Sequence, residues 1–315
     1  MANPDVSFIV PAFNEERHLP LALEGIRSAM NAGRSYEMIV ADHGSTDGTA
    51  SAAVAGGARV ASFAGARTIG ELRNRAAAEA RGRVFVFLDA DVVLGSEWGR
   101  AFADVFATLS DDPMVLTGSR LLVSRESTWV ARTWFPDPQS DRVAGHVGSG
   151  HMILTRELFR LIEGFPPELE TGEDYAICVE ARRRGARIVN NPALVAYHLG
   201  PPETVAEFWR REVWHGRGDT HDLRTAARSA VAWSAVGFAG AHGILVLSLL
   251  GIVPGVGAFL ALAIIVTLSV GSAARRTGSG DALVLLRGSI LFYLYYWARA
   301  TALVGGQGEK RVRRT

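Results

Sequence analysis

The stretch Val84-Phe85-Val86-Phe87-Leu88-Asp89-Ala90-Asp91 joins five apolar residues to two acids that are separated by one small residue. A short, wholly apolar run is typical of a strand that is buried on both faces, as in a parallel sheet. In an extended backbone residues i and i+2 point to the same side, so Asp89 and Asp91 can face one site. This arrangement suits a divalent metal that carries a diphosphate, and the alternative is a solvated turn.

Strand-like and helix-like segments alternate four times in the first third of the chain. The predicted strands are Val6–Val10, Tyr36–Ala41, Arg59–Phe63 and Val84–Leu88. The predicted helices lie within Arg17–Ala32, Thr49–Ala55 and Gly70–Arg81, and a fourth begins after Ser96, which we expect to cap it. This alternation predicts an α/β domain with a mainly parallel sheet covered by helices.

Polar residues follow several of these strands at their carboxyl ends. Asn14 and Glu15 follow the first strand, Asp42 follows the second, and Asp89 and Asp91 follow the fourth. Ligands of open α/β sheets bind outside the carboxyl ends of the strands. We therefore expect these residues to form one nucleotide-binding edge.

The overall composition excludes several classes of protein. Lys and Arg number 33 and Asp and Glu number 32, so no nucleic-acid surface is expected. Cys178 is the only cysteine, which excludes an internal disulfide and fits a reducing compartment. Residues 1–5 lack the basic start and apolar core of a secretory signal, so we expect the first part of the chain to lie in the cytosol.

Apolar residues gather near the end of the chain. Residues 229–251 and 252–274 contain no Asp, Glu, Lys or Arg, and each stretch is long enough to cross a bilayer. Because the turn Gly251-Ile252-Val253-Pro254-Gly255 lies between them, we predict a transmembrane helical hairpin over residues 229–274. A pair of buried core helices is the alternative.

A third apolar stretch, residues 282–304, is interrupted by Arg287 and Arg299. Its uncharged centre is short for a span unless both arginines reach the membrane surface. Basic residues cluster at 210–228, at 275–276 and at 310–314, and all three clusters can be cytosolic only if this stretch does not cross fully. We favour two spans with a re-entrant or interfacial third helix, and three spans are the alternative.

These patterns divide the chain into a catalytic domain, a membrane-surface segment, a spanning hairpin, a third apolar helix and a basic cytosolic tail. The aromatic and basic residues of Phe208-Trp209-Arg210-Arg211-Glu212-Val213-Trp214-His215 suit a helix that lies on the membrane surface. The expected ranges are 1–203, 204–228, 229–274, 282–304 and 305–315. We expect a multi-pass protein of the inner or plasma membrane whose catalytic domain is cytosolic.

An ordered set of short motifs resembles the family 2 glycosyltransferases, which have the GT-A nucleotide-sugar fold. The set covers about two-thirds of the chain. Its pieces are Pro11-Ala12-Phe13-Asn14-Glu15, Asp42-His43-Gly44-Ser45-Thr46-Asp47-Gly48-Thr49, Arg67 through Arg73-Asn74, Leu88-Asp89-Ala90-Asp91, Gly148-Ser149-Gly150, Arg156, Gly164-Phe165 and Gly172-Glu173-Asp174-Tyr175.

The resemblance implies roles on the side of the nucleotide-sugar donor. Residues Pro11, Ala12, Asn14, Glu15 and Asp42 would surround the nucleotide, with Asp42 and the main chain at Ala12 on the base. In the D-x-D motif Asp89 would lie near the ribose beside Ala90, and Asp91 would help to hold Mg²⁺ or Mn²⁺, which prefer oxygen ligands. Arg67 and Arg73 would contact the diphosphate, and a solvated helix face is the alternative for both.

On the acceptor side the resemblance implies that Asp174 is the general base. Asp174 belongs to an E-D motif at the start of a helix, where a carboxylate is favoured in its ionised form, and a helix cap is the alternative. Gly150 and Glu173 would belong to the same acceptor region. His198, after the apolar strand Leu194–Tyr197, would lie near the metal as a secondary site. Enzymes of this kind invert the anomeric centre in one displacement.

Two departures from the family pattern affect specificity. No Gln stands where processive members have a Q-x-x-R-W motif, so we expect transfer of a single sugar. His43 replaces a second Asp after Asp42, which leaves UDP as the first expectation for the base and GDP as the second. The acceptor is expected to be lipid-linked or membrane-proximal, and no pattern specifies the sugar or the oligomeric state.

Two other functions compete with glycosyl transfer. A sugar-nucleotide pyrophosphorylase would need a glycine-rich, basic phosphate loop after the first strand, where this chain has Pro11-Ala12-Phe13-Asn14-Glu15. A non-catalytic transferase scaffold that binds a membrane partner would not need Asp89, Asp91 and Asp174 together.

Overall fold

The computed structural model describes residues 3–31, 33–136, 146–219, 227 and 229–304. The described residues form two compact units. Residues 3–124 and 146–200 make up the first unit, and residues 125–136 together with those after 200 make up the second. Residues 125–136, which fall inside the predicted domain 1–203, therefore pack with the C-terminal helices.

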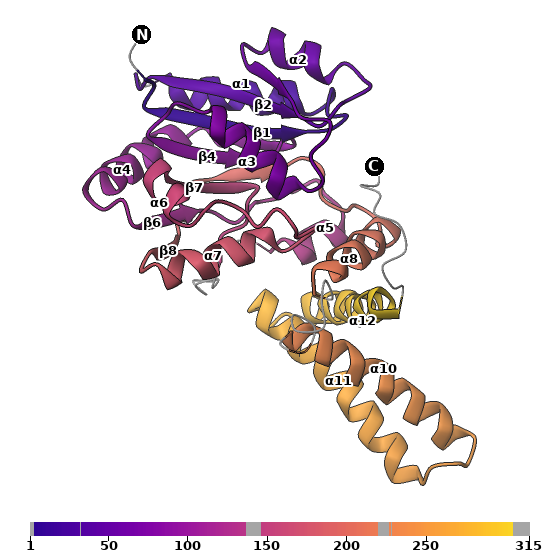
Figure 1. Ribbon diagram of the computed structural model, residues 1–315. Helices are drawn as coiled ribbons and strands as arrows, with labels where there is room; N and C mark the ends of the chain where they lie inside the picture. Colours follow the sequence, from indigo (N-terminus) through magenta and orange to yellow (C-terminus); the bar gives the residue numbers. More distant parts are fainter. Residues whose placement is uncertain (1–2, 32, 137–145, 220–226, 228, 305–315) are drawn as a thin grey trace. The chain divides into compact units, whose positions relative to one another are not determined.

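The first unit is built on a seven-stranded sheet with the order β3-β2-β1-β4-β7-β6-β8 (Figure 1). Its strands are β1 Val6–Ala12, β2 Tyr36–Asp42, β3 Arg59–Ser62, β4 Val84–Leu88, β6 Val115–Gly118, β7 His151–Thr155 and β8 Arg187–Asn190. All pairs are parallel except those of β7, which runs antiparallel to β4 and β6. The predicted mainly parallel sheet is confirmed, with one reversed strand inserted.

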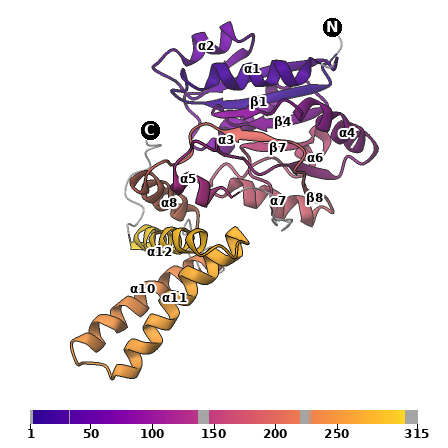
Figure 2. The same cartoon turned by 180° about the vertical axis from the view of Figure 1, so that it is seen from behind.

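Helices cover both faces of this sheet (Figures 1 and 2). They are α1 Leu19–Met30, α2 Thr49–Ala55, α3 Ile69–Glu79, α4 Trp98–Asp111, α6 Arg156–Leu161 and α7 Glu173–Arg183. Alternate residues of β1 enter different cores: Phe8 and Val10 pack with α1 and α4, while Ile9 packs with α3, α6 and α7. A strand with both faces buried has this two-residue period and is apolar throughout.

Two predicted boundaries in the first unit are wrong. β1 does not end before Pro11 but continues to Ala12, with Pro11 in register with Ala41. Proline removes an N–H donor but remains compatible with an extended backbone at the end of a strand. The residue that precedes α4 is Glu97, not Ser96, and no side chain caps this helix.

The second unit consists of helices around an aromatic core. They are α5 Trp129–Trp134, α8 Val205–Asp219, α10 Ala230–Leu249, α11 Gly255–Thr277 and α12 Ala282–Val304. α10 and α11 form an antiparallel hairpin through a turn at Gly251, whose φ is 74°. Trp134, Phe208, Phe238 and Phe292 bring α5, α8, α10 and α12 together in one apolar cluster.

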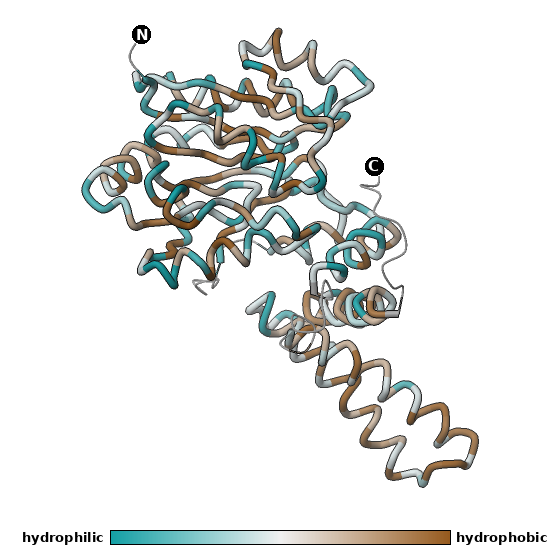
Figure 3. Tube along the Cα trace, in the orientation of Figure 1, coloured by the Kyte–Doolittle hydropathy of each residue, from teal (hydrophilic) through white to brown (hydrophobic). Residues whose placement is uncertain are grey.

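Both helices of the hairpin are long and apolar enough to cross a membrane. Apolar residues line most of the hairpin in Figure 3, and Leu249 and Phe259 expose 78% and 72% of their surface. Within the described residues, α10 and α11 are the two helices that meet this test. α12 is not among them. Its Arg299 guanidinium lies 2.9 Å from the Glu212 carboxylate of α8, and both side chains are nearly buried.

Candidate active site

The carboxyl ends of β1, β2 and β4 meet at one edge of the sheet, which we call the acidic edge. Ala12 at the end of β1 is in register with Asp42 at the end of β2, and β4 pairs with β1 on its other side. Burial raises the pKa of Glu15, and the nearby carboxylates of Asp91 and Asp89 raise it further, whereas His18 at 3.1 Å lowers it. The structure therefore brings Glu15, Asp89 and Asp91 together, as expected.

Asp42 and Asn14 hold the two loops that follow β1 and β2. The nearly buried carboxylate of Asp42 accepts hydrogen bonds from the backbone N–H groups of Gly44 (3.1 Å) and Ser45 (3.2 Å). The side-chain oxygen of Asn14 accepts one from the N–H of Thr46 (2.9 Å). Asn14 adopts a φ of 56°, in the left-handed region that asparagine tolerates better than most residues. These bonds fix the loops beside the predicted nucleotide site.

His43 also holds this region in place. Its Nε2 lies 2.7 Å from the carbonyl oxygen of Ala66, and a carbonyl only accepts, so this nitrogen carries the proton. The ring packs edge-on against Phe13 with centroids 5.8 Å apart. His43 thus ties two loops together.

Asp91 and His198 are brought together by a small second sheet. β5 Val92–Leu94 pairs antiparallel with β9 Ala196–His198, and Val92 is in register with His198. This pairing places His198 Nε2 3.2 Å from Asp91 Oδ2. Burial alone would raise the pKa of Asp91, but the hydrogen bond and charge of His198 contribute to a pKa below its ordinary value. Asp91 is therefore held as an anion.

Gly200 and Gly150 each leave room for one carboxylate of the D-x-D motif. A Cβ atom on Gly200 would lie 2.7 Å from Asp91 Oδ2, and one on Gly150 would lie 2.6 Å from Asp89 Oδ2. Real Cβ atoms essentially never approach this closely. No local sequence pattern points to Gly200, because its closeness to Asp91 depends on the β5–β9 pairing.

Arg73 joins the D-x-D motif to the E-D motif. Its guanidinium lies 2.6 Å from Asp89 Oδ1 and 2.9 Å from Glu173 Oε1, and only 1% of the side chain is exposed. Burial alone would lower the pKa of Arg73, but the charges of Asp89 and Glu173 contribute to a raised pKa. Both terminal nitrogens of the predicted diphosphate contact are thus engaged by carboxylates. Arg67, by contrast, is 78% exposed and pairs with Glu71 at 3.3 Å.

The turn Gly148-Ser149-Gly150 touches three acids in succession. A Cβ on Gly148 would lie 3.7 Å from Asp174 Oδ2, and Ser149 Oγ donates a hydrogen bond to Glu173 Oε1 at 2.9 Å. The carbonyl of Gly150 accepts from the N–H of Asp89 at 3.1 Å. Asp174 itself lies in the first turn of α7, after Gly172 in the left-handed conformation. The turn before β7 therefore gathers Asp89, Glu173 and Asp174.

The acidic edge can supply some, but not all, of the ligands that a hard divalent cation needs. Asp91 offers a carboxylate oxygen and His198 an imidazole nitrogen, both of which Mn²⁺ accepts. Within the described ranges, no three His, Cys, Asp or Glu side chains converge on one point. The remaining positions of an octahedral shell would then be filled by phosphate oxygens and water, as is usual for Mg²⁺.

Comparisons with known proteins agree with this fold. Residues 7–156 match the family model described as glycosyl transferase family 2. Over 99 residues the chain is 36% identical to glucosyl-3-phosphoglycerate synthase of Mycobacterium tuberculosis. That match covers 29% of this chain and 30% of the relative, so the alignment spans under a third of the relative's length.

Solved structures resemble the chain over nearly its whole length. A mannosyltransferase of Pyrobaculum calidifontis, PcManGT, in complex with GDP-Man and Mn²⁺, superposes with a TM-score of 0.63 at 19% identity. The superposition covers 98% of this chain and 89% of that one. Residues 1–349 of TarS from S. aureus give a TM-score of 0.51 at 15% identity, covering 96% and 92%. At these identities the likeness shows the fold.

Proposed function

We infer a specific transfer reaction for this chain, which belongs to glycosyl transferase family 2 and has the GT-A fold. The chain moves a single sugar from a nucleotide-diphosphate sugar to a hydroxyl of a lipid-linked or membrane-proximal acceptor. The reaction inverts the anomeric carbon and depends on Mg²⁺ or Mn²⁺. The observation that supports this proposal is the Arg73 bridge, in which one guanidinium pairs with Asp89 and with Glu173, the residue before Asp174.

Asp174 is the proposed general base. The acceptor oxygen attacks the anomeric carbon while the bond from that carbon to the diphosphate oxygen breaks, and the hydroxyl proton passes to the Asp174 carboxylate. One displacement of this kind inverts the centre. Asp174 suits this role because it is half-buried beside Gly148, whereas the neighbouring Glu173 is buried and held by Arg73 and Ser149.

Asp91 and His198 are the proposed protein ligands of the metal. When bound, the cation neutralises charge on the departing diphosphate as a Lewis acid. The complex of PcManGT with GDP-Man and Mn²⁺ supports a metal in this fold. Because His198 Nε2 and Asp91 Oδ2 lie at hydrogen-bond distance, a metal bound by both would replace that hydrogen bond.

The donor base is proposed to lie between the ends of β1 and β2. Pro11, Ala12 and Asn14 line one side, and Asp42 lies on the other in register with Ala12. UDP is the first candidate and GDP the second. The solved relatives support testing both, because TarS was solved with UDP-GlcNAc and PcManGT with GDP-Man.

A membrane location is proposed from the second unit. α10 and α11 would span the bilayer, α8 would lie at its surface, and the basic clusters would keep the catalytic unit on the cytosolic side. An enzyme held at a membrane reaches a lipid-linked acceptor without releasing it into water. This placement supports an acceptor that is itself anchored in the bilayer.

The proposal is tested with the purified full chain in detergent and a panel of UDP- and GDP-sugars with Mn²⁺. We expect one donor to release nucleoside diphosphate slowly, and chelation of the metal to stop the release. Asp91→Asn should reduce it by about 10²–10³-fold, the scale of losing electrostatic stabilisation of developing charge. Asp104→Asn, at an exposed position of α4, is the matched control and should retain the rate.

Other outcomes of the same panel would contradict the proposal. Release of nucleoside diphosphate that is equal in wild type and Asp91→Asn would exclude the metal site. Release of pyrophosphate from a nucleoside triphosphate and a sugar phosphate would identify a pyrophosphorylase. Donor binding without any turnover, even with membrane lipids present as acceptors, would support the alternative of a non-catalytic scaffold.

A further inference from the structure

The two arginines of α12 lie in different surroundings. Arg299 has a carboxylate partner in Glu212, at 2.9 Å. Arg287 is half-buried and has no ion pair with any residue that the structure describes. It lines a cavity of about 320 Å³ instead.

This cavity combines cations with hydroxyl groups. Arg132 of α5 and Arg287 of α12 supply guanidinium groups, and Thr133, Thr277 and Ser279 supply hydroxyls. Trp129 adds an aromatic wall, and every lining residue belongs to the second unit. Guanidinium groups and hydroxyls are hydrogen-bond donors that match the oxygens of a phosphate.

No carboxylate lines the cavity or pairs with its arginines within the described part of the chain. Asp281, the nearest acid in sequence, is occupied at the start of α12, where it accepts the N–H groups of Leu283 (2.8 Å) and Val284 (2.9 Å). Arg276 adds positive charge beside the cavity, fixed by two hydrogen bonds to the Trp134 carbonyl. The local excess of positive charge therefore selects an anion.

The position of the cavity selects a lipid as the source of that anion. Thr277 is the last residue of α11, so a spanning α11 would put the cavity at the level of the lipid headgroups. Beside Arg287, the apolar side chains of Leu283, Leu286 and Ile290 are exposed on α12 at positions that share one face. A headgroup phosphate in the cavity would leave its acyl chains next to this apolar face.

We propose that the cavity between Arg132 and Arg287 binds the phosphate of an anionic phospholipid headgroup. The proposal rests on the membrane attachment inferred above but not on the transfer reaction. Bound lipid would fix α12 to the bilayer surface through Arg287, the arginine of this helix that has no carboxylate partner among the described residues. It also accounts for Arg287 in a helix that is otherwise largely apolar, since Arg299 is already paired with Glu212.

The test uses the full chain in detergent, with dihexanoyl phosphatidylglycerol as the probe and thermal unfolding as the readout. We expect this lipid to raise the unfolding temperature with a saturable dose dependence, and dihexanoyl phosphatidylcholine to have a weaker effect. Arg132→Gln and Arg287→Gln should each weaken the apparent affinity by about tenfold, as for the loss of one charge-assisted hydrogen bond. Arg275→Gln, which removes a charge outside the cavity, should retain the affinity.

Several results would overturn the proposal. Equal shifts from the two lipids, or an unchanged affinity in both glutamine variants, would show that the cavity is not the site. An equal shift from inorganic phosphate would assign the cavity to a soluble anion. If a glutamine variant does not fold, Arg132→Lys and Arg287→Lys keep the charge and should retain part of the affinity. Asp91→Asn should reduce donor hydrolysis by about 10²–10³-fold and leave lipid binding intact, which separates this proposal from the transfer reaction.

Discussion

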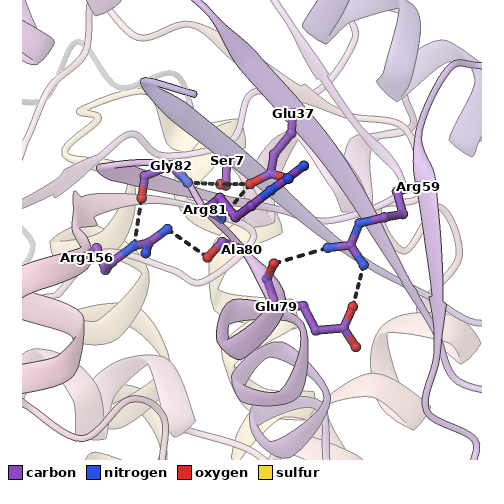
Figure 4. Close-up of polar contacts among 8 residues, drawn as sticks. All are labelled: Ser7, Glu37, Arg59, Glu79, Ala80, Arg81, Gly82 and Arg156. Carbon is purple, nitrogen blue, oxygen red and sulfur yellow. Dashed lines mark hydrogen bonds and ion pairs between the residues drawn. The ribbon is translucent and has the colours of Figure 1, made fainter. Parts of the chain in front are cut away.

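Polar side chains gather at both ends of the strands in the sheet of the first unit, but they bind different partners. We call the end opposite the acidic edge the amino edge, where Ser7, Glu37, Gly82 and Arg156 lie (Figure 4). At the amino edge, shown in Figure 4, Arg156 donates to the carbonyls of Gly82 (2.8 Å) and Ala80 (2.7 Å). Ser7 Oγ donates to Glu37 (2.7 Å) and accepts from the N–H of Gly82 (2.8 Å). Charges and hydrogen bonds at this edge are thus taken up by the backbone and by each other.

The acidic edge has more carboxylates than cations. Its acids are Glu15, Asp42, Asp89, Asp91, Glu173 and Asp174, and the buried cation among them is Arg73. The pKa of Glu37 at the amino edge is lowered, since Ser7 and Arg81 outweigh its burial, whereas that of Glu15 at the acidic edge is raised. The comparison teaches that polar groups which pair with one another and with the backbone stabilise the fold, whereas an excess of carboxylates can bind a ligand of opposite charge.

The largest expected difference between the edges is in turnover. Asp174→Asn removes the proposed proton acceptor and should lower kcat by about 10²–10⁴-fold, with donor binding retained. Glu37→Gln at the amino edge should leave kcat unchanged, because this carboxylate contacts only structural partners. Steady-state kinetics of both variants would check this, and a similar kcat for Asp174→Asn and wild type would remove Asp174 from the mechanism.

Removal of the buried cation tests the acidic edge through stability. Arg73→Met leaves Asp89 and Glu173 without their shared partner and should lower the free energy of unfolding by about 3–5 kcal/mol. Arg156→Met removes two hydrogen bonds to carbonyls at a half-buried position and should cost about 1.5–3 kcal/mol. Denaturant unfolding measures both losses. A smaller loss for Arg73→Met than for Arg156→Met would contradict the comparison.

Alanine substitutions at Gly82 and Gly150 should distinguish the two edges, because one should reduce stability and the other activity. A Cβ on Gly82 would lie 2.4 Å from the backbone nitrogen of Ser7, so Gly82→Ala should destabilise the fold by about 1–3 kcal/mol. A Cβ on Gly150 would meet the Asp89 carboxylate, which can rotate away, so Gly150→Ala should lose activity more than stability. Unfolding and donor hydrolysis are measured on both variants, and the reverse pattern would refute this division.

A buried histidine behind the acidic edge gives the stability of the fold a pH dependence that is limited to acid solution. Trp98 Nε1 donates to His151 Nε2 at 2.9 Å, so this nitrogen must be unprotonated, and burial lowers the pKa of His151 from 6.5 to about 3. The unfolded chain therefore binds the proton more readily. Stability that is complete above pH 6.5 should be lost as the pH falls toward 3, by about 1.4 kcal/mol per pH unit.

His151→Gln provides the control for this effect. Glutamine does not titrate, so the variant should lose about one proton's worth of the acid dependence between pH 6 and 4. Thermal or denaturant unfolding at several pH values measures the slope. An unchanged slope would show that His151 is protonated in the folded protein or that other groups dominate.

Much of the first unit could be predicted because its patterns are local. The apolar run Val84–Leu88 is strand β4 over the same residues, and Thr49–Ala55 is helix α2. The D-x-D acids follow β4 and approach Glu15, as the topology of parallel strands requires. The antiparallel direction of β7 could not be predicted, because the sequence of a short apolar strand does not show whether it pairs parallel or antiparallel with its neighbours.

The partners of single charged residues could not be predicted. The sequence predicts the same diphosphate contact for Arg73 and Arg67, yet Arg73 is buried between two carboxylates and Arg67 is exposed beside Glu71. No sequence pattern distinguishes Arg287 from Arg299, yet Arg287 lines a cavity and Arg299 pairs with Glu212. Each outcome depends on residues far away in the chain.

The sequence by itself determined the alternation of strands and helices, the acids that follow the strands, and the apolar hairpin, because side-chain periodicity and long uncharged stretches act over neighbouring residues. The tertiary structure decided which acids meet. The turn Gly148-Ser149-Gly150 joins Asp89 to Glu173 and Asp174, and Arg73 holds the first two together. Such contacts form only after β7 and α7 pack beside β4, since their geometry depends on packing between segments that no local pattern records.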